Sequence, residues 1–307
     1  MAGTPSLSSM ERVPDIGIVS DGKPGHLNQS LGLADALRRL RPELTVREYP
    51  AMGRLTALYR LLVPDDGLRG TRLLIGAGHH THLSLLAMRR GAGCPAVVLM
   101  SPSLPERWFD LCIPPRHDGD EETAQRWLSD GPLNRMRPST EPRKSRGLIL
   151  VGGPSSHFHW SEAAILGQIT RLCDGESEWT LSTSRRTPSG FLRGLAALEL
   201  PGLQIHRMDE QVPGWLAAEL PTVQHCWVTP DSASMVYEAL SAGCAVGVFD
   251  LPARPDSRIA TSLRSLADRG ILSHFQTVDL GGTLTPLNPP FAEADRMAQR
   301  IVERGWF

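Results

Sequence analysis

The stretch "DIGIVSDGKPGHLNQSLGLADALRRL", residues 15–40, changes character twice along its length. Its first six residues are a short apolar run that predicts a β-strand, and its last part has the apolar spacing of a helix over about residues 27–40. Residues 20–30 lie between them as a glycine-containing loop that carries the polar side chains of Lys23, His26, Asn28 and Gln29. A turn needs fewer polar groups than this, so the loop is a candidate functional site.

The same succession of strand and helix recurs along the chain. Further strands are predicted at residues 44–50, 71–78, 95–101, 110–115, 147–153, 179–184, 224–229 and 245–250. Further helices are predicted at residues 82–90, 161–173, 234–242, 258–270 and 291–305. Short apolar strands that alternate with helices favour an α/β fold with parallel sheets covered on both faces. Ligands of such sheets bind beyond the carboxyl ends of the strands, where the unusual loops of this chain fall.

The length and one change of composition predict two domains. A chain of 307 residues exceeds one ordinary core, and residues 133–147 are polar, basic and proline-containing, as a linker is. We expect a disordered leader at 1–14, an N-terminal domain at 15–140 and a C-terminal domain at 141–307. The final helix, 291–307, is expected to pack back on the N-terminal domain.

Composition narrows the class of protein. At 41% hydrophobic and 21% charged residues the chain is typical of a soluble globular protein, and its net charge of -1 argues against a general nucleic-acid binder. The five cysteines form no CxxC pair and lie in or near apolar runs, which predicts reduced thiols in a cytoplasmic protein. The first 15 residues lack the apolar core of a signal peptide, and no run approaches the roughly 20 apolar residues of a membrane span.

Two motifs of the second half suit phosphate binding. In "VGGPSSHFHWSE", residues 151–162, glycines follow a strand directly, where the backbone can approach a ligand; the alternative is a turn into a helix capped by Ser161. In "STSRRTP", residues 182–188, hydroxyls and two arginines follow another strand; the alternative is a solvated basic loop.

The stretch "TPDSASMVYEAL", residues 229–240, is the most specific motif. It delivers Asp231, Ser232 and Ser234 to a helix N-terminus, whose free amides and dipole favour pyrophosphate. Glu238 lies one turn further on the face of Ser234 and can accept hydrogen bonds from ribose hydroxyls. The alternative is helix capping by Asp231 or Ser232, with Glu238 as a surface residue.

Three other site types are disfavoured. "IGAGHHTHL", residues 75–83, has Thr81 where a dinucleotide fingerprint needs its third glycine, and "GKPG" lacks the spacing of a phosphate-binding P-loop. His79, His80 and His82 match no zinc pattern, so we expect a polar cleft wall here and no metal.

The stretches "DGKPGHLNQSLGLA", "GGPSSHFHW", "TSRRTP" and "TPDSASMVYEAL" together resemble, in their order, the motifs of the mitochondrial fission ELM ("elongated mitochondria") family. The similarity spans roughly residues 15–270. Bacterial members of that family are regarded as glycosyltransferases, so the resemblance implies a GT-B-like fold: two Rossmann-like domains with parallel sheets facing a central cleft. It further implies that the C-terminal domain holds a nucleotide-sugar and the N-terminal domain the acceptor.

On this basis we predict a metal-independent glycosyltransferase that needs no cofactor. His26 is the expected general base, a usual role of histidine near neutral pH, and Lys23 is expected to stabilise the leaving diphosphate. The expected donor-binding residues are Gly152, Gly153, Pro154, Ser184, Arg185, Arg186, Asp231, Ser232, Ser234, Met235 and Glu238. The expected acceptor or cleft residues are Gly22, Gly25, Asn28, Gln29, His79 and His80. The alternative for His26 is a structural role in the loop or helix cap.

The acceptor and the cellular location of the protein follow less directly from the sequence. The expected acceptor is a glycan or a lipid-linked molecule, and the expected location is the cytoplasm, with the inner face of the membrane as a peripheral site. "MGRLTALYRLLVP", residues 52–64, is either an amphipathic helix that contacts an anionic membrane or, as the spacing favours, a helix packed in the core. The alternative to an enzyme is a GT-B-shaped interaction protein without catalysis.

Overall fold

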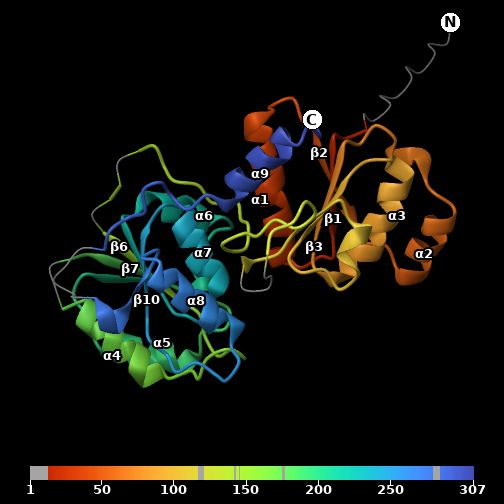
Figure 1. The fold of residues 1–307 in the computed structure, drawn as a ribbon. Helices are drawn as coiled ribbons and strands as arrows, with labels where there is room; N and C mark the ends of the chain where they lie inside the picture. The colour runs from red at the N-terminus through yellow and green to blue at the C-terminus, as the bar shows by residue number, and fades with distance from the viewer. Residues whose placement is uncertain (1–12, 117–120, 142, 145, 175–176, 279–283) are drawn as a thin grey trace, which may run out of the picture. The chain divides into compact units, whose positions relative to one another are not determined.

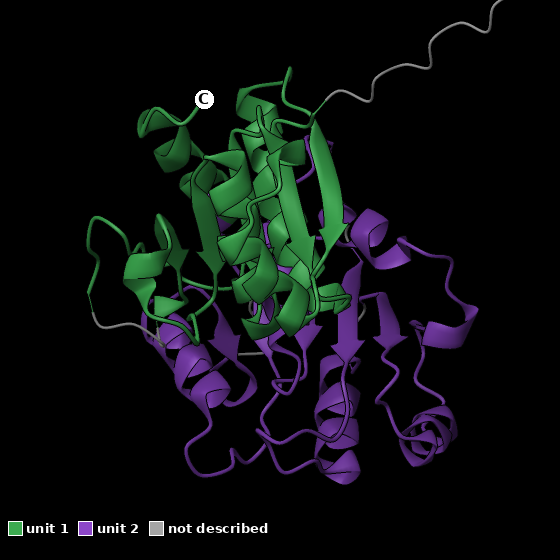
Figure 2. Ribbon diagram, turned by 90° about the vertical axis from the view of Figure 1, so that its right-hand side faces the viewer, with its two compact units in different colours: residues 1–133, 294–307 green, residues 134–293 purple. Residues whose placement is uncertain are grey.

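Two compact units make up the described chain, and each has its own parallel sheet (Figure 1; Figure 2). The computed structural model describes residues 13–116, 121–141, 143–144, 146–174, 177–278 and 284–307. Unit 1 comprises residues up to 133 together with 294–307, and unit 2 comprises residues 134–293. The α/β fold class with two Rossmann-like domains is therefore confirmed; most of the leader expected at 1–14 lies outside the described residues.

The sheet of unit 1 has the strand order β2-β1-β3-β4-β5, with every pairing parallel. Its strands are β1 Ile16–Ser20, β2 Val46–Pro50, β3 Leu73–Ala77, β4 Ala96–Leu99 and β5 Leu111–Ile113. Its helices are α1 Pro24–Leu40, α2 Arg54–Leu62, α3 His82–Ala92 and α9 Glu293–Glu303. The short apolar runs form strands because both faces of a parallel sheet are buried.

Alternate residues of these strands supply two separate apolar clusters. Ile16 and Ile18 pack with α1 and α9 on one face, whereas Val19 and Leu74 pack with α3 on the other (Figure 1). The last helix thus completes a face of the first unit: Met297 is fully buried in the same cluster as Ile16.

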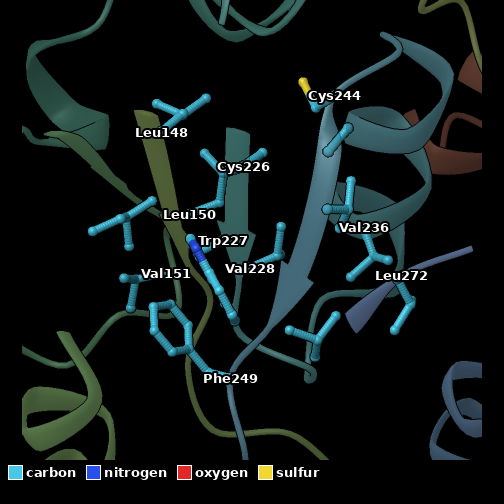
Figure 3. Close-up of a cluster of buried hydrophobic side chains, with 14 of the residues drawn as sticks. Leu148, Leu150, Val151, Cys226, Trp227, Val228, Val236, Cys244, Phe249 and Leu272 are labelled. Carbon is cyan, nitrogen blue, oxygen red and sulfur yellow. The ribbon is translucent and has the colours of Figure 1, made fainter. Parts of the chain in front are cut away.

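The sheet of unit 2 has the order β11-β10-β9-β6-β7-β8 and is also parallel. Its strands are β6 Gly147–Val151, β7 Trp179–Thr183, β8 Leu203–His206, β9 His225–Val228, β10 Ala245–Val248 and β11 Ser273–His274. Its helices are α4 Glu162–Leu172, α5 Ser189–Ala197, α6 Trp215–Glu219, α7 Ala233–Ser241 and α8 Arg258–Asp268. Buried side chains of β6, β9 and α7, among them Leu150, Trp227 and Val236, form its core (Figure 3).

The units divide seven residues before the expected boundary at 140–141, after Leu133. Residues 134–140 belong with unit 2 because the Asn134 side-chain amide donates to Ser241 Oγ at 3.0 Å and to the Tyr237 carbonyl at 3.4 Å.

All five cysteines are buried free thiols. None of the helices in the described part of the chain has the length and apolar character needed to cross a bilayer.

Helix α2 lies differently from the favoured expectation. Only Ala57 of this helix is fully buried, whereas Leu55, Leu58 and Leu62 are exposed. The prediction that residues 52–64 pack in the core was wrong, because the apolar spacing of a helix does not tell which of its faces meets the protein.

Candidate functional site

The loop after β1 is shorter than the sequence indicated. Helix α1 begins at Pro24, and Lys23 is its N-cap. Proline suits the first helical position, because its fixed φ is helical and the amide it lacks would have no partner there. Gly25 and His26 were expected in the loop before the helix, but they lie in the first turn of α1; Asn28 and Gln29 lie near the start of the helix, as predicted.

A carboxylate orients the candidate base. Asp21 Oδ2 lies 2.9 Å from His26 Nδ1, and the two side chains are only 3% and 19% exposed. Because an ionised carboxylate only accepts hydrogen bonds, Nδ1 donates, and in the neutral imidazole the lone pair is then on Nε2. Burial alone would raise the pKa of Asp21, but the hydrogen bonds from His26 and the Lys23 amide outweigh it, and the pKa is lowered.

Asp21 was not among the predicted site residues. The signal was an acidic residue five positions before the histidine, across a turn that contains Gly22. Sequence spacing alone did not indicate that the chain reverses enough for the two side chains to meet.

The imidazole of His26 also packs closely against the end of β3. A Cβ at Gly78 would lie 2.3 Å from the His26 ring, and Gly78 has a φ of 82° that favours glycine. The ring is therefore held between Asp21 and the backbone after β3.

A pocket of about 920 Å³ opens at the carboxyl ends of the strands of unit 1. Four of the predicted residues line it, namely Gly22, Lys23, His79 and His80. Asp21 and Arg54 line it as well, together with the apolar side chains of Met52, Leu83 and Leu104. His26, Gly25, Asn28 and Gln29 do not line this pocket; Gln29 donates to Met100 Sδ at 3.6 Å.

The three neighbouring histidines differ in environment. His79 and His80 are exposed, with ring centroids 4.0 Å apart; the charge of His80, followed by desolvation, lowers the pKa of His79. His82 is buried, and burial lowers its pKa to about 4, so it is neutral at pH 7. In the described part of the chain, no three His, Cys, Asp or Glu side chains lie together as a metal ion requires.

In unit 2, three loops meet at the carboxyl ends of β6, β7 and β9. The Gly152 amide donates to Thr229 Oγ1 at 2.8 Å, and the Gly153 amide donates to Asp231 Oδ2 at 2.9 Å. Ser184 Oγ donates to the Gly152 carbonyl at 3.0 Å. The predicted donor loops at 152–154, 184–186 and 229–231 therefore lie together.

Arg186 joins all three loops. Its Nη2 lies 2.8 Å from Asp231 Oδ2, and its Nη1 donates to the carbonyls of Gly153 at 3.1 Å and Pro154 at 3.0 Å. The Asp231 side chain is only 1% exposed, so the guanidinium balances a buried charge. Arg185 and Arg186 are both exposed, so Arg186 differs by these contacts and not by burial.

The two glycines after β6 are explained by this packing. A Cβ at Gly152 would lie 2.1 Å from Asp231 Oδ2, and one at Gly153 would lie 2.1 Å from the Arg186 carbonyl oxygen. No side chain fits at either position, whether or not a ligand binds beside them.

Helix α7 begins directly after these loops. Ser232 is its N-cap, but no side-chain hydrogen bond caps the helix, and Asp231 binds Gly153 and Arg186 instead. Ser234 is exposed in the first turn, Met235 packs partly on the core, and Glu238 is half-buried one turn beyond Ser234. The cap predicted for Ser161, as the alternative to a ligand site at residues 151–162, does form. At the start of α4, Ser161 Oγ accepts a hydrogen bond from the Ala164 amide.

The two parallel-sheet units define a GT-B-like fold, and comparison with solved structures agrees. MurG from Acinetobacter baumannii matches with a TM-score of 0.52 at 13% identity over 94% of this chain and 98% of that one. A protein from Listeria monocytogenes assigned as a UDP-N-acetylglucosamine 2-epimerase matches with a TM-score of 0.61 at 10% identity over 94% of each chain. No curated protein matches the sequence.

The family is settled by sequence. The profile of the mitochondrial fission ELM1 family matches residues 24–305, nearly the whole chain. The chain therefore belongs to the mitochondrial fission ELM1 family, and the resemblance seen in its motifs is confirmed.

Proposed function

We propose that this chain is a glycosyltransferase that moves a sugar from a nucleotide-diphosphate sugar to a hydroxyl acceptor. The observation that carries the proposal is the pair formed by Asp21 and His26, 2.9 Å apart at the carboxyl end of β1. A buried carboxylate that fixes one imidazole nitrogen and frees the other is the arrangement that a general base needs. The GT-B-like fold supports the same class of reaction by analogy.

The proposed base chemistry uses unit 1. His26 does not line the unit 1 pocket, but its partner Asp21 does, so the acceptor hydroxyl is assigned to that edge of the pocket. There His26 Nε2 takes the proton of the hydroxyl as its oxygen attacks the anomeric carbon, and the bond from that carbon to the diphosphate oxygen breaks. The negative charge of Asp21 stabilises the imidazolium that results. Lys23, which lines the pocket of unit 1, is assigned to the charge of the leaving diphosphate.

The proposed donor site uses unit 2. The diphosphate binds at the N-terminus of α7 beside Ser232 and Ser234, where the free amides and the helix dipole favour an anion. The exposed Arg185 adds a positive charge, and Glu238 accepts hydrogen bonds from the ribose. These groups balance the diphosphate without a metal ion, so neither a metal nor a cofactor is part of the proposal.

The proposed acceptor is a glycan or a lipid-linked molecule. The unit 1 pocket combines the cationic Lys23 and Arg54 with apolar walls at Met52, Leu83 and Leu104, which suits a molecule with both anionic and apolar parts. The proposal places the protein in the cytoplasm, peripheral at the inner face of the membrane.

One observation favours a second candidate, a GT-B-shaped interaction protein without catalysis. Arg186, one of the two arginines expected on the diphosphate, is engaged by Asp231 and two backbone carbonyls. An arginine used in this way supports loop structure, which an inactive relative of the enzymes would also retain.

Calorimetry with a panel of nucleotide-diphosphate sugars separates the two candidates. An enzyme should bind one nucleotide, and at a hundredfold excess over Kd that ligand stabilises the fold by about 2.7 kcal/mol. Arg185→Ala should weaken this binding. If no nucleotide binds or shifts the melting temperature, the enzyme proposal is abandoned for the interaction protein.

The base is tested on the same preparation. His26→Ala should lower turnover by about 10²–10⁴ with unchanged donor affinity, because the donor is held by unit 2. His206→Ala, a partly buried histidine of unit 2 that stacks on Trp215, is the control and should retain turnover. Wild-type turnover in His26→Ala would remove the base from the proposal.

A further inference from the structure

Helix α2 carries an exposed apolar stripe, defined here by Leu55, Leu58, Tyr59 and Leu62. Their spacing of three, four and seven residues places them on one helical face, and they are 84%, 48%, 57% and 79% exposed. Val63, 46% exposed, follows directly after the helix. The main packing partner of α2 is α3 (Figure 1). Thus α2 turns the small residue Ala57 toward the protein, leaves Leu61 half-buried, and turns the stripe toward solvent.

The stripe is the main concentration of exposed apolar side chains in the described residues. Of the eleven large hydrophobic side chains exposed there, five lie within residues 55–63. Single exposed apolar residues need no explanation, but a contiguous set on one helix marks a surface that meets something apolar.

The charges around the stripe are positive. Residues 52–64 contain Arg54 and Arg60 and no acidic residue. The acids that follow, Asp65 and Asp66, pair with Arg60 at 3.2 Å and with Arg69 at 3.1 Å. Residues 52–69 therefore hold three arginines against two acids, and the surplus positive charge is that of Arg54. Arginines beside exposed leucines and a tyrosine are typical of helices that lie in the interface of an anionic bilayer.

The stripe is continuous with the pocket of unit 1. Met52, Gly53 and Arg54, which lead into α2 and begin it, line that pocket. A surface that receives the stripe therefore also approaches the mouth of the pocket, where Lys23 adds a further positive charge.

A second copy of the chain fits the stripe poorly. A helix of nine residues is only about 13 Å long, and one face of it offers far less than the roughly 800 Å² per partner of a stable dimer. A symmetric pairing would also bring together two copies of a surface whose net charge is positive, and like charges repel. A bilayer has no such area requirement, and anionic headgroups match the surplus positive charge of Arg54.

We propose that α2 docks the protein on an anionic lipid bilayer, with the stripe among the acyl chains near the interface and Arg54 at the headgroups. Docking brings the mouth of the unit 1 pocket to the membrane surface. The inference does not depend on glycosyl transfer, because the stripe and its charges can bind lipid whatever unit 2 holds.

Vesicle sedimentation of the full chain tests the proposal. The probes are vesicles of phosphatidylcholine alone and vesicles in which about one third of the lipid is phosphatidylglycerol. Wild type should bind the anionic vesicles at least about tenfold better, and raising salt should weaken that binding. Leu55→Gln/Leu62→Gln should reduce binding to anionic vesicles at least about tenfold.

The matched control is Leu198→Gln/Val212→Gln, which changes two exposed apolar side chains of unit 2 that are 39% and 69% exposed. It should bind vesicles like wild type, and both variants should melt like wild type, because the substituted side chains are exposed. Undiminished binding by the α2 variant, or no binding by wild type, overturns the proposal. A concentration-dependent dimer that only the α2 variant loses, without vesicle binding, would assign the stripe to a second copy. Donor calorimetry on the same samples reports separately on the proposed enzyme.

Discussion

Replacing Arg186 by methionine should destabilise unit 2, although the side chain lies in a polar surface loop. Methionine keeps much of the length of the side chain but removes the guanidinium. The substitution leaves the carboxylate of Asp231, whose side chain is 1% exposed, without its cationic partner. It also removes the donors to the carbonyls of Gly153 and Pro154.

The size of the destabilisation expected for Arg186→Met follows from the burial of Asp231 and the exposure of Arg186. Breaking a buried ion pair costs about 3–5 kcal/mol, because the remaining charge stays buried without compensation. Two features place Arg186→Met at the lower end of this range. The Arg186 side chain is 43% exposed, so water partly screens the pair, and the Gly153 amide still donates to Asp231. We expect a loss of about 3 kcal/mol, which lowers the melting temperature by about 6–12 °C in a unit of this size.

Urea unfolding followed by tryptophan fluorescence measures the loss. The matched control is Arg185→Met in the same loop, which should change the free energy of unfolding by less than about 0.5 kcal/mol, because no ion pair or hydrogen bond among the described residues involves the Arg185 side chain. In an Asp231→Asn background, Arg186→Met should cost only about 1 kcal/mol, since no buried charge is left behind. Equal costs for the two arginines, or an unchanged cost in that background, would refute the assigned role.

Three further predictions concern unit 1. Gly78→Ala should cost about 1–3 kcal/mol in urea unfolding and displace His26, because φ is 82° and the new Cβ would lie 2.3 Å from the ring; Gly167→Ala, inside α4 with open space around it, should instead stabilise slightly. Asp21→Asn should lower turnover by about 10²–10⁴ and alter the pH–rate profile, while a purely structural Asp21 would change stability alone. His82 has a pKa of about 4 in the fold against 6.5 in the unfolded chain, so the unfolded state binds the proton first as pH falls. Its contribution to stability should therefore drop by about 2 kcal/mol between pH 7 and pH 5, and His82→Gln should remove this part of the pH dependence.

Much of the fold was predictable because buried parallel strands are continuous apolar runs. The runs at 16–20, 73–77 and 147–151 formed strands within the ranges predicted, and the helices between them were recognised by their spacing. Strands β8 and β11 and helices α5 and α6 were missed. The residues of β8 are half-exposed at the edge of the sheet, so their pattern lacks the apolar run of a central strand.

The site was predictable as a set of loops but not as a set of contacts. The position of a loop at the end of a strand follows from topology, which is why residues 152–154 and 184–186 meet as expected. Which of two adjacent arginines turns inward depends on the rotamers and on the partner, and the sequence contains no sign that Arg186 and not Arg185 reaches Asp231. The partnership of Asp21 with His26 likewise depends on a turn whose geometry only the folded chain specifies.

The placement of α9 in unit 1 has a consequence for biosynthesis. The sheet of unit 1 leaves the ribosome first, yet Met297 and Ile301, which cover the same face as Leu33 and Leu37, are translated only after the whole of unit 2. Unit 2 is a continuous stretch and can complete its core while the apolar face above α1 is still open. Chains released after a stop that follows residue 293 should therefore carry a finished second unit and an unfinished first one, with that open apolar face as a target for a chaperone.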